Sequence, residues 1–154
     1  MINYMKQLQE VIYKLYGSNN FKVEKSLLST DNSTITKLNN GCILKVLYNK
    51  DAYEKEVAIL QDLKNCNCII NLKQFWNEVN TFDNNFNSFK IMLPYYEDGD
   101  LFTFIKSNQI LNLMDIKNIF SKLLIPVKYC HDKNIIHIDL KLENFLIKKN
   151  IDNY

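Results

Sequence analysis

The spacing of apolar residues changes along the chain, and this change limits the folds that the chain can adopt. Residues 21–48 contain three strand-like segments, FKVEKSLLS, STITKL and CILKVLY, and the turn sequence NNG joins the last two. CIINLKQFWNEVN and FKIMLPYY predict two further strands, separated by an asparagine-rich turn. The later segments follow a helical period instead. This order predicts an α+β fold with an antiparallel sheet and helices gathered at one end.

One helix is expected within the strand region. Asp51 is positioned to cap a helix that runs to about Lys64, and its buried face is expected to include Ile59, Leu60 and Leu63.

The other expected helices lie outside the strand region. Asp100 is expected to cap a short helix over LFTFIKSN, and Asp115 to open a long helix through Tyr129. Pro126 lies inside the long helix, where a kink is expected. Residues 2–16 predict an amphipathic helix that either packs on the domain or binds a partner.

Composition indicates a globular intracellular protein, with the cytoplasm as the expected compartment. Apolar residues make up 47% and charged residues 23% of the chain, and no segment is long and apolar enough to cross a membrane. The net charge of +2 is spread along the chain, so no nucleic-acid or membrane partner is expected. The four cysteines lack metal-binding spacing and are expected to be free thiols.

The segment HIDLKLENFLI at 137–147 combines residue types that are typical of a catalytic loop. Its polar positions, His137, Asp139, Lys141 and Asn144, resemble the protein kinase pattern H-R-D-L-K-x-x-N. Earlier segments resemble the other kinase motifs in the order that the family requires: CILKVL, then KEVAILQDL, then KIMLPYYEDGDL. The resemblance covers roughly residues 21–147 and identifies the chain as similar to Ser/Thr protein kinases.

The resemblance implies a kinase-like fold with a complete small lobe and only the first part of the helical large lobe. The small lobe would consist of an antiparallel sheet and one helix. The expected boundaries are an N-terminal helix at 1–17, the small lobe and hinge at 18–98, and the partial large lobe at 99–154.

The resemblance also implies a role for each motif residue in phosphate transfer from ATP. Asp139 would orient the attacking hydroxyl, and Lys141 would offset the charge of the transferring phosphoryl group. Asn144 would hold Mg²⁺ through its amide oxygen. Lys45 would neutralise the α- and β-phosphates, and Glu56 would hold the ammonium of Lys45 in position. The lysine at 141 is typical of kinases that modify serine or threonine.

The hinge residues are assigned by the same resemblance. Leu93 would control access to the back of the adenine pocket. The carbonyl of Pro94 would accept from adenine, and the backbone N–H of Tyr96 would donate to it. Asp100 would either bind the ribose or cap the following helix, and the sequence leaves these two roles open.

Three departures from the family pattern weigh against ordinary activity. The turn that should cover the phosphates has Ser29, Asp31 and Thr34 in place of glycines, which allow close approach of backbone amides to phosphate. Ile43 replaces the small alanine that lies against adenine. All 19 basic residues are lysine, and Ile138 replaces the arginine of the loop motif, so no arginine is present to bind a phosphorylated activation loop.

The sequence ends ten residues after Asn144, before a D-F-G motif would be expected. Asp152 lies too soon after Asn144 for that role. The expected function is therefore a protein kinase homologue, truncated and weak or inactive alone.

Two alternatives remain open. One is a catalytically dead fragment that binds and modulates a complete kinase, and the other is a decaying gene product. Apolar residues that the rest of a large lobe would cover are expected to form an exposed face for a protein partner: Ile116, Phe120, Leu123, Leu124, Ile135 and Ile136.

Overall fold

The structure is a computed structural model, and it describes residues 21–79, 87–107 and 112–148. The helix predicted at 2–16, most of the asparagine-rich turn and Asp152 lie outside the described residues. The chain divides into two compact units, which are described separately below. The first comprises Met1–Lys64 and Ile70–Tyr95, and the second comprises Asn65–Ile69 and Tyr96–Tyr154.

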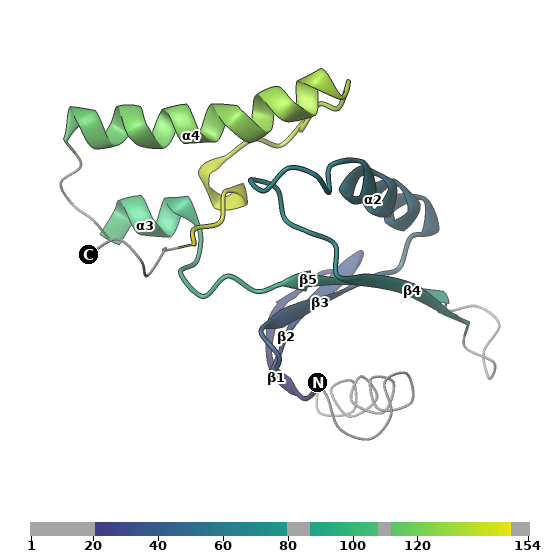
Figure 1. Cartoon of the computed structure of the whole chain (residues 1–154). Helices are drawn as coiled ribbons and strands as arrows, with labels where there is room; N and C mark the ends of the chain where they lie inside the picture. The colour runs from purple at the N-terminus through teal and green to yellow at the C-terminus, as the bar shows by residue number, and fades with distance from the viewer. Residues whose placement is uncertain (1–20, 80–86, 108–111, 149–154) are drawn as a thin grey trace. The chain divides into compact units, whose positions relative to one another are not determined.

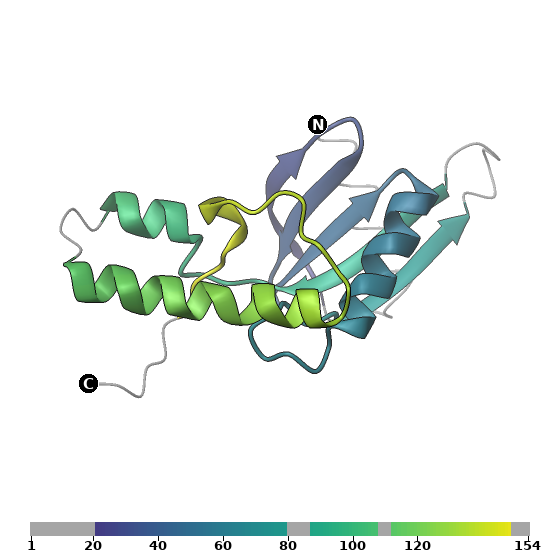
Figure 2. The ribbon, with the colours of Figure 1, turned by 90° about the horizontal axis from the view of Figure 1, so that it is seen from above.

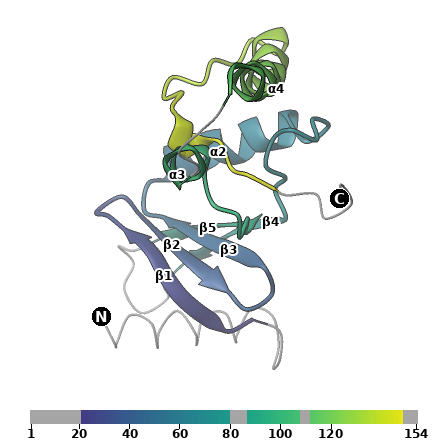
Figure 3. The same cartoon turned by 90° about the vertical axis from the view of Figure 1, so that its left-hand side faces the viewer.

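The first unit is built on a five-stranded antiparallel sheet with strand order β1-β2-β3-β5-β4 (Figures 1 and 3). Gly41 turns the chain between β2 and β3 with a φ of 74°, a left-handed conformation that glycine adopts without a steric penalty. The antiparallel sheet predicted from the sequence is confirmed. Its strands are β1 Val23–Ser29, β2 Ser33–Leu38, β3 Cys42–Leu47, β4 Gln74–Val79 and β5 Asn87–Pro94.

The two faces of the sheet carry separate apolar clusters, because side chains alternate between faces along each strand. Leu38, Leu44, Val46 and Met92 form one buried cluster. The other cluster joins the sheet to helix α2, which spans Lys50–Asp62 and packs on β3 and β5 (Figure 2). Its buried members are Leu47, Val57, Leu60, Phe89, Ile91 and Leu93.

Helix α2 differs from the prediction at its start and on its buried face. Asn49, not Asp51, is the N-cap: its backbone is extended, and its side-chain oxygen accepts from Ala52 N at 2.9 Å. Asp51 lies in the first turn, where its charge favours the helix dipole. Ile59 is 42% exposed, and Val57 is buried in its place because the helix is rotated so that Val57 and Leu60 face the sheet.

The segment CIINLKQFWNEVN forms a strand only in its second half. Residues 68–73 are irregular, and among them Lys73 N donates to Met92 O before regular pairing of β4 with β5 begins. The apolar residues of this segment bury without a strand, since Ile70 and Leu72 pack against the cluster beneath α2. The prediction of a strand from residue 68 is therefore wrong for its first part.

The second unit contains helix α3, Leu101–Ser107, helix α4, Leu113–Asp132, and a short 3₁₀ helix η1, Leu142–Asn144. Asn112 is the N-cap of α4, and Asp115 completes a capping box instead of opening the helix. The helix continues through Pro126 to Asp132, beyond the predicted end. It then stops at a turn in which Asn134 is left-handed, with a φ of 58°, and Ile135 N donates to Cys130 O.

Helix α4 carries an exposed apolar face along much of its length. We call the residues Ile116, Phe120, Leu124 and Ile125 the α4 face, and their side chains are 50–61% exposed in the described structure. The prediction that several large apolar residues of this region stay exposed is confirmed, while Leu123 and Ile135 are partly covered. Within the described ranges, no helix combines the length and apolarity that crossing a membrane requires.

Candidate functional site

Lys45 and Glu56 form an ion pair within the first unit. Lys45 lies on β3 and Glu56 on α2, and Lys45 Nζ is 2.7 Å from each carboxylate oxygen of Glu56. The two side chains are 23% and 28% exposed, so the pair is partly shielded from water. Glu54, on the same helix, instead pairs with Lys50 at 3.5 Å and is far more exposed. The ammonium of Lys45 is thus held against the carboxylate of Glu56, between β3 and α2.

The predicted hinge residues lie at the end of β5. Leu93 is 6% exposed and is the Cα partner of Ile43, while Pro94 is the partner of Cys42. Leu93 therefore shares a sheet face with Ile43 and, two residues further, with Lys45. Tyr96 begins the second unit, and its carbonyl accepts from Gly99 N at 3.3 Å.

The turn between β1 and β2 is closed by its own polar side chains. Thr30 N donates to Ser33 O at 2.8 Å, and Ser33 N donates to Thr30 Oγ1 at 3.1 Å. Thr34 is 3% exposed, and its hydroxyl lies 3.1 Å from that of Tyr48. No residue of this turn has a positive φ, so the turn lacks the open backbone geometry that glycines allow.

The segment with the catalytic-loop pattern is anchored to the start of α3 within the second unit. Leu101 N donates to Phe145 O at 2.8 Å, and Ile147 N donates to Gly99 O at 2.9 Å. These bonds flank an isolated bridge between Asp100 and Leu146. The loop is therefore fixed at its C-terminal end by backbone pairing.

Asp139, Lys141 and Asn144 come together in this loop. Lys141 Nζ lies 2.7 Å from Asp139 Oδ2, and Asn144 Nδ2 donates to Asp139 O at 2.7 Å and to Oδ2 at 3.3 Å. The bond from Lys141, and then that from Asn144, lower the pKa of Asp139 below its ordinary value. The same bond raises the pKa of Lys141. The carboxylate is thus kept ionised and oriented.

Asp100 is engaged as a helix cap. Its Oδ1 accepts from Thr103 N at 2.8 Å and its Oδ2 from the Thr103 hydroxyl at 3.1 Å. The backbone bond from Thr103 is the main cause of a lowered pKa for Asp100. Both carboxylate oxygens already have partners, and this favours the capping role among the two that the sequence left open.

Asn144 is the residue that the sequence predicted to contact Mg²⁺. Asn144 uses its amide nitrogen toward Asp139, which leaves the amide oxygen, a ligand type that Mg²⁺ accepts. Across the described ranges no group of three His, Cys, Asp or Glu side chains is placed to hold a metal ion.

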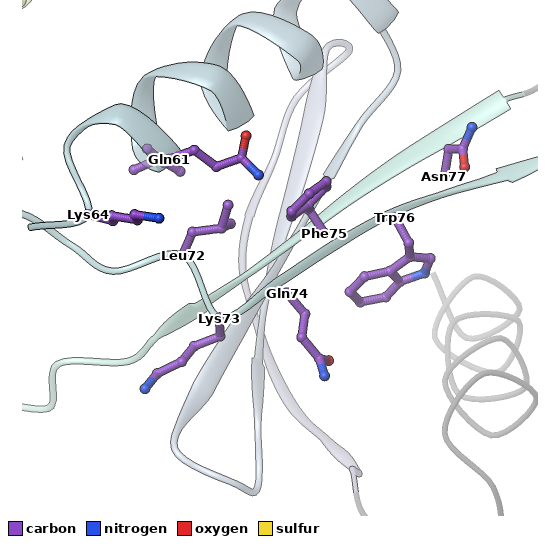
Figure 4. A pocket seen from close by; sticks show the side chains of 9 residues that line it. Gln61, Lys64, Leu72, Lys73, Gln74, Phe75, Trp76 and Asn77 are labelled. Carbon is purple, nitrogen blue, oxygen red and sulfur yellow. The ribbon is translucent and has the colours of Figure 1, made fainter.

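A separate depression lies on the first unit, between the end of α2 and the edge strand β4 (Figure 4). Its volume is about 680 Å³, and its walls include Leu60, Lys64, Leu72 and Phe75. Neither Lys45 nor Glu56 lines it. It is open and shallow, and it does not coincide with the residues that the sequence singled out.

The sequence reasoning missed Lys37 on β2. Its Nζ lies 3.1 Å from Glu24 Oε2 and 4.7 Å from the centre of the Tyr95 ring. The signal that could have found it is the pairing of β2 with β3, which sets Lys37 opposite Ile43.

Comparison with known proteins identifies the relatives of the chain. The family model described as Protein kinase domain matches residues 29–152. Serine/threonine-protein kinase SIK1 of Mus musculus is 28% identical over 144 residues, which cover 92% of this chain and 17% of that protein. NUAK family SNF1-like kinase 2 of Homo sapiens is 37% identical over 60 residues, 39% of this chain and 10% of that protein.

A solved structure shares the fold. The crystal structure of Rad53 1-466 in complex with AMP-PNP matches with a TM-score of 0.63 and 22% identity, covering 84% of this chain and 35% of that chain. The described residues therefore have a kinase-like fold, corresponding to a small lobe and the start of a large lobe. The chain spans less than a fifth of the length of the two kinases named above.

Proposed function

The chain belongs to the protein kinase domain family, and from this premise we propose that it carries the nucleotide-binding lobe and catalytic loop of an enzyme that transfers phosphate from ATP to serine or threonine of a protein. The observation that carries the proposal is the ion pair of Lys45 with Glu56, which holds an ammonium 2.7 Å from both carboxylate oxygens. An ammonium held in this way offsets the charge of bound phosphates without further rearrangement.

The catalytic loop supports the same function. In this proposal, Asp139 accepts a hydrogen bond from the attacking hydroxyl, and its lowered pKa keeps it ionised for this role. Lys141 moves from Asp139 toward the transferring phosphoryl group. The amide oxygen of Asn144 is the group that would contact Mg²⁺, which supplies charge neutralisation when it is bound.

The adenine end of the ligand would meet Leu93, the carbonyl of Pro94 and the N–H of Tyr96. We assign Asp100 to capping of α3, since Thr103 occupies both of its carboxylate oxygens. Transfer by these 154 residues alone is expected to be weak, because the β1–β2 turn has no glycine and Ile43 crowds the base.

Nucleotide binding tests the proposal most directly. Isothermal titration calorimetry with ATP should detect binding by the chain, and Lys45→Met should weaken it at least about tenfold, the loss of one charge-assisted contact of about 1.4 kcal/mol. Lys50→Met is the matched control, since it removes an exposed lysine at the start of α2. Equal affinity of the wild type and Lys45→Met would refute the proposed role of Lys45.

The α4 face favours a second function, that of an interaction protein that binds and modulates a complete protein kinase. Phe120 is 61% exposed and Leu124 50% exposed on one side of a regular helix, which is a typical arrangement for a contact surface. The test is co-purification with a complete Ser/Thr kinase. Phe120→Glu with Leu124→Glu should abolish the complex, whereas Lys45→Met should leave it intact.

A further inference from the structure

Lys37 lies on the same face of the sheet as Lys45. In the antiparallel pair of β2 and β3, the Cα partner of Lys37 is Ile43, and Lys45 follows Ile43 by two residues. Directly opposed residues share a face, as do alternate residues of one strand. The side chains of Lys37 and Lys45 therefore project from one face of the sheet, with Lys37 directly opposite Ile43 and Lys45 in the next cross-strand row.

An aromatic ring and a carboxylate are among the groups that contact the Lys37 ammonium. Its Nζ lies 4.7 Å from the centre of the Tyr95 ring, within the range of a cation–π interaction. Glu24 Oε2 lies 3.1 Å away, and the Lys37 side chain is 24% exposed. The backbone of Tyr95 is held beside Gly41, because its N–H donates to Gly41 O at 2.8 Å. A positive charge is thus held against an aromatic ring two residues after Leu93.

This placement matters if the first unit binds nucleotide, so the inference rests on the proposed function. Ile43 is the residue that the family resemblance sets against adenine, and Tyr95 directly precedes Tyr96, to which the adenine contact was assigned. We propose that Lys37 is a further residue of the nucleotide-binding face, and that its side chain occupies the space of the purine base so that this face selects a triphosphate chain over the base.

The selectivity follows from what each part of the ligand must displace. A purine that lies against Ile43 and Tyr95 has to move the Lys37 ammonium off the aromatic ring and away from Glu24. A triphosphate chain at Lys45 leaves the contacts of Lys37 in place, and it gains attraction from Lys45 and from the charge of Lys37 on the same face. The chain should therefore bind inorganic triphosphate nearly as well as ATP, and adenosine poorly.

Calorimetry with adenosine, ATP and inorganic triphosphate tests this inference on the whole chain. Lys37→Val, which suits a strand and removes both bulk and charge, should raise the affinity for adenosine about fivefold or more, the amount expected from losing one cation–π contact and a partly exposed ion pair. The affinity for inorganic triphosphate should not rise. Lys50→Ala, which also removes one lysine, should leave the affinity for adenosine unchanged.

The outcomes separate this inference from the proposed function. If ATP binding depends on Lys45 but adenosine affinity is the same in the wild type and Lys37→Val, the role of Lys37 is refuted and the proposed function stands. If neither protein binds ATP, both are refuted. Should Lys37→Val fail to give a folded circular dichroism spectrum, Lys37→Met, which keeps the length and removes the charge, is measured instead, and an unchanged adenosine affinity again refutes the inference.

Discussion

Asn144 fixes Asp139 from two directions, since its Nδ2 donates to the Asp139 carbonyl at 2.7 Å and to the Asp139 carboxylate at 3.3 Å. The second bond leaves Oδ2 in contact with Lys141 at 2.7 Å, so one carboxylate oxygen is shared between an amide and an ammonium. Asn144 thereby acts on the backbone and the side chain of the same residue. The orientation of Asp139 depends on neighbours within its own loop.

The titration of Asp139 should reveal the contact with Lys141. Lys141→Met should raise the pKa of Asp139 toward its ordinary value of 3.8, because the hydrogen bond from Lys141 is the largest cause of its lowering. Carboxyl-carbon NMR measures the shift, and Lys122→Met on α4 is the control. An Asp139 titration that is identical in wild type and Lys141→Met would contradict the geometry of the loop.

The lowered pKa of Asp139 also makes the free energy of unfolding depend on pH. The folded-state pKa of Asp139 lies below its unfolded value, so the contribution of these bonds is complete above the unfolded value. It is lost as the pH falls below about 3.8 and through the folded-state pKa. Lys141→Met should reduce this part of the acid dependence of unfolding, measured by urea titration at several pH values.

Glu56 and Glu54 offer a matched pair of substitutions on one helix. Glu56→Gln should weaken ATP binding about fivefold, because a partly exposed ion pair that positions Lys45 contributes about 1 kcal/mol. Glu54→Gln should leave the affinity unchanged, since Glu54 pairs with Lys50 instead. Fluorescence or calorimetric titration measures both. Equal effects of the two substitutions would mean that the affinity for ATP depends only on the net charge of the chain and not on the position of Glu56.

The stability of the protein should depend on Asn49, the N-cap of α2. Asn49→Ala should lower the free energy of unfolding by about 1 kcal/mol, because Ala52 N loses the side-chain oxygen that it donates to. Asn49→Ser should keep most of the stability. Urea unfolding followed by circular dichroism provides the measurement, and a similar loss in Asn49→Ser would indicate a role other than capping.

The α4 face should tolerate charge. Phe120→Lys with Leu124→Lys should change the free energy of unfolding by no more than about 0.5 kcal/mol per site, because both side chains are at least 50% exposed. Binding of a hydrophobic dye should fall. Leu44→Ala, at a fully buried position, is the contrasting variant and should cost about 2–5 kcal/mol. Strong destabilisation by the double lysine variant would show that the face is covered.

The elements that the sequence predicted well are those with strong periodic signals. The alternation in STITKL and CILKVL was sufficient to place β2 and β3, and with them Lys45. The helix with Glu56 was also predicted, but its first residue was not, because Asn49 and Asp51 are both good capping residues and only the extended backbone of Asn49 decides between them. Residues 68–73 were misassigned because an apolar run can be buried without strand pairing.

The contacts that sequence could not supply depend on strand register. Lys37 meets Tyr95 because β2 pairs with β3 in one particular alignment, and the alternation of side chains within each strand does not by itself say which residues of two strands lie opposite each other. A shift by one residue would turn Lys37 to the other face. The ion pair of Lys141 with Asp139 was missed for a different reason, since alternation says nothing about side chains in a loop.

The two backbone bonds that join Gly99 and Leu101 to Ile147 and Phe145 tie together segments far apart in the sequence. Because Phe145 directly follows Asn144, these hydrogen bonds connect the catalytic-loop segment to the residues that follow Tyr96. A backbone movement at Gly99 is therefore expected to shift the loop that contains Asp139 through these hydrogen bonds, without a change in α3 or α4. A ligand bound near Tyr96 is therefore expected to influence the orientation of the Asp139 carboxylate.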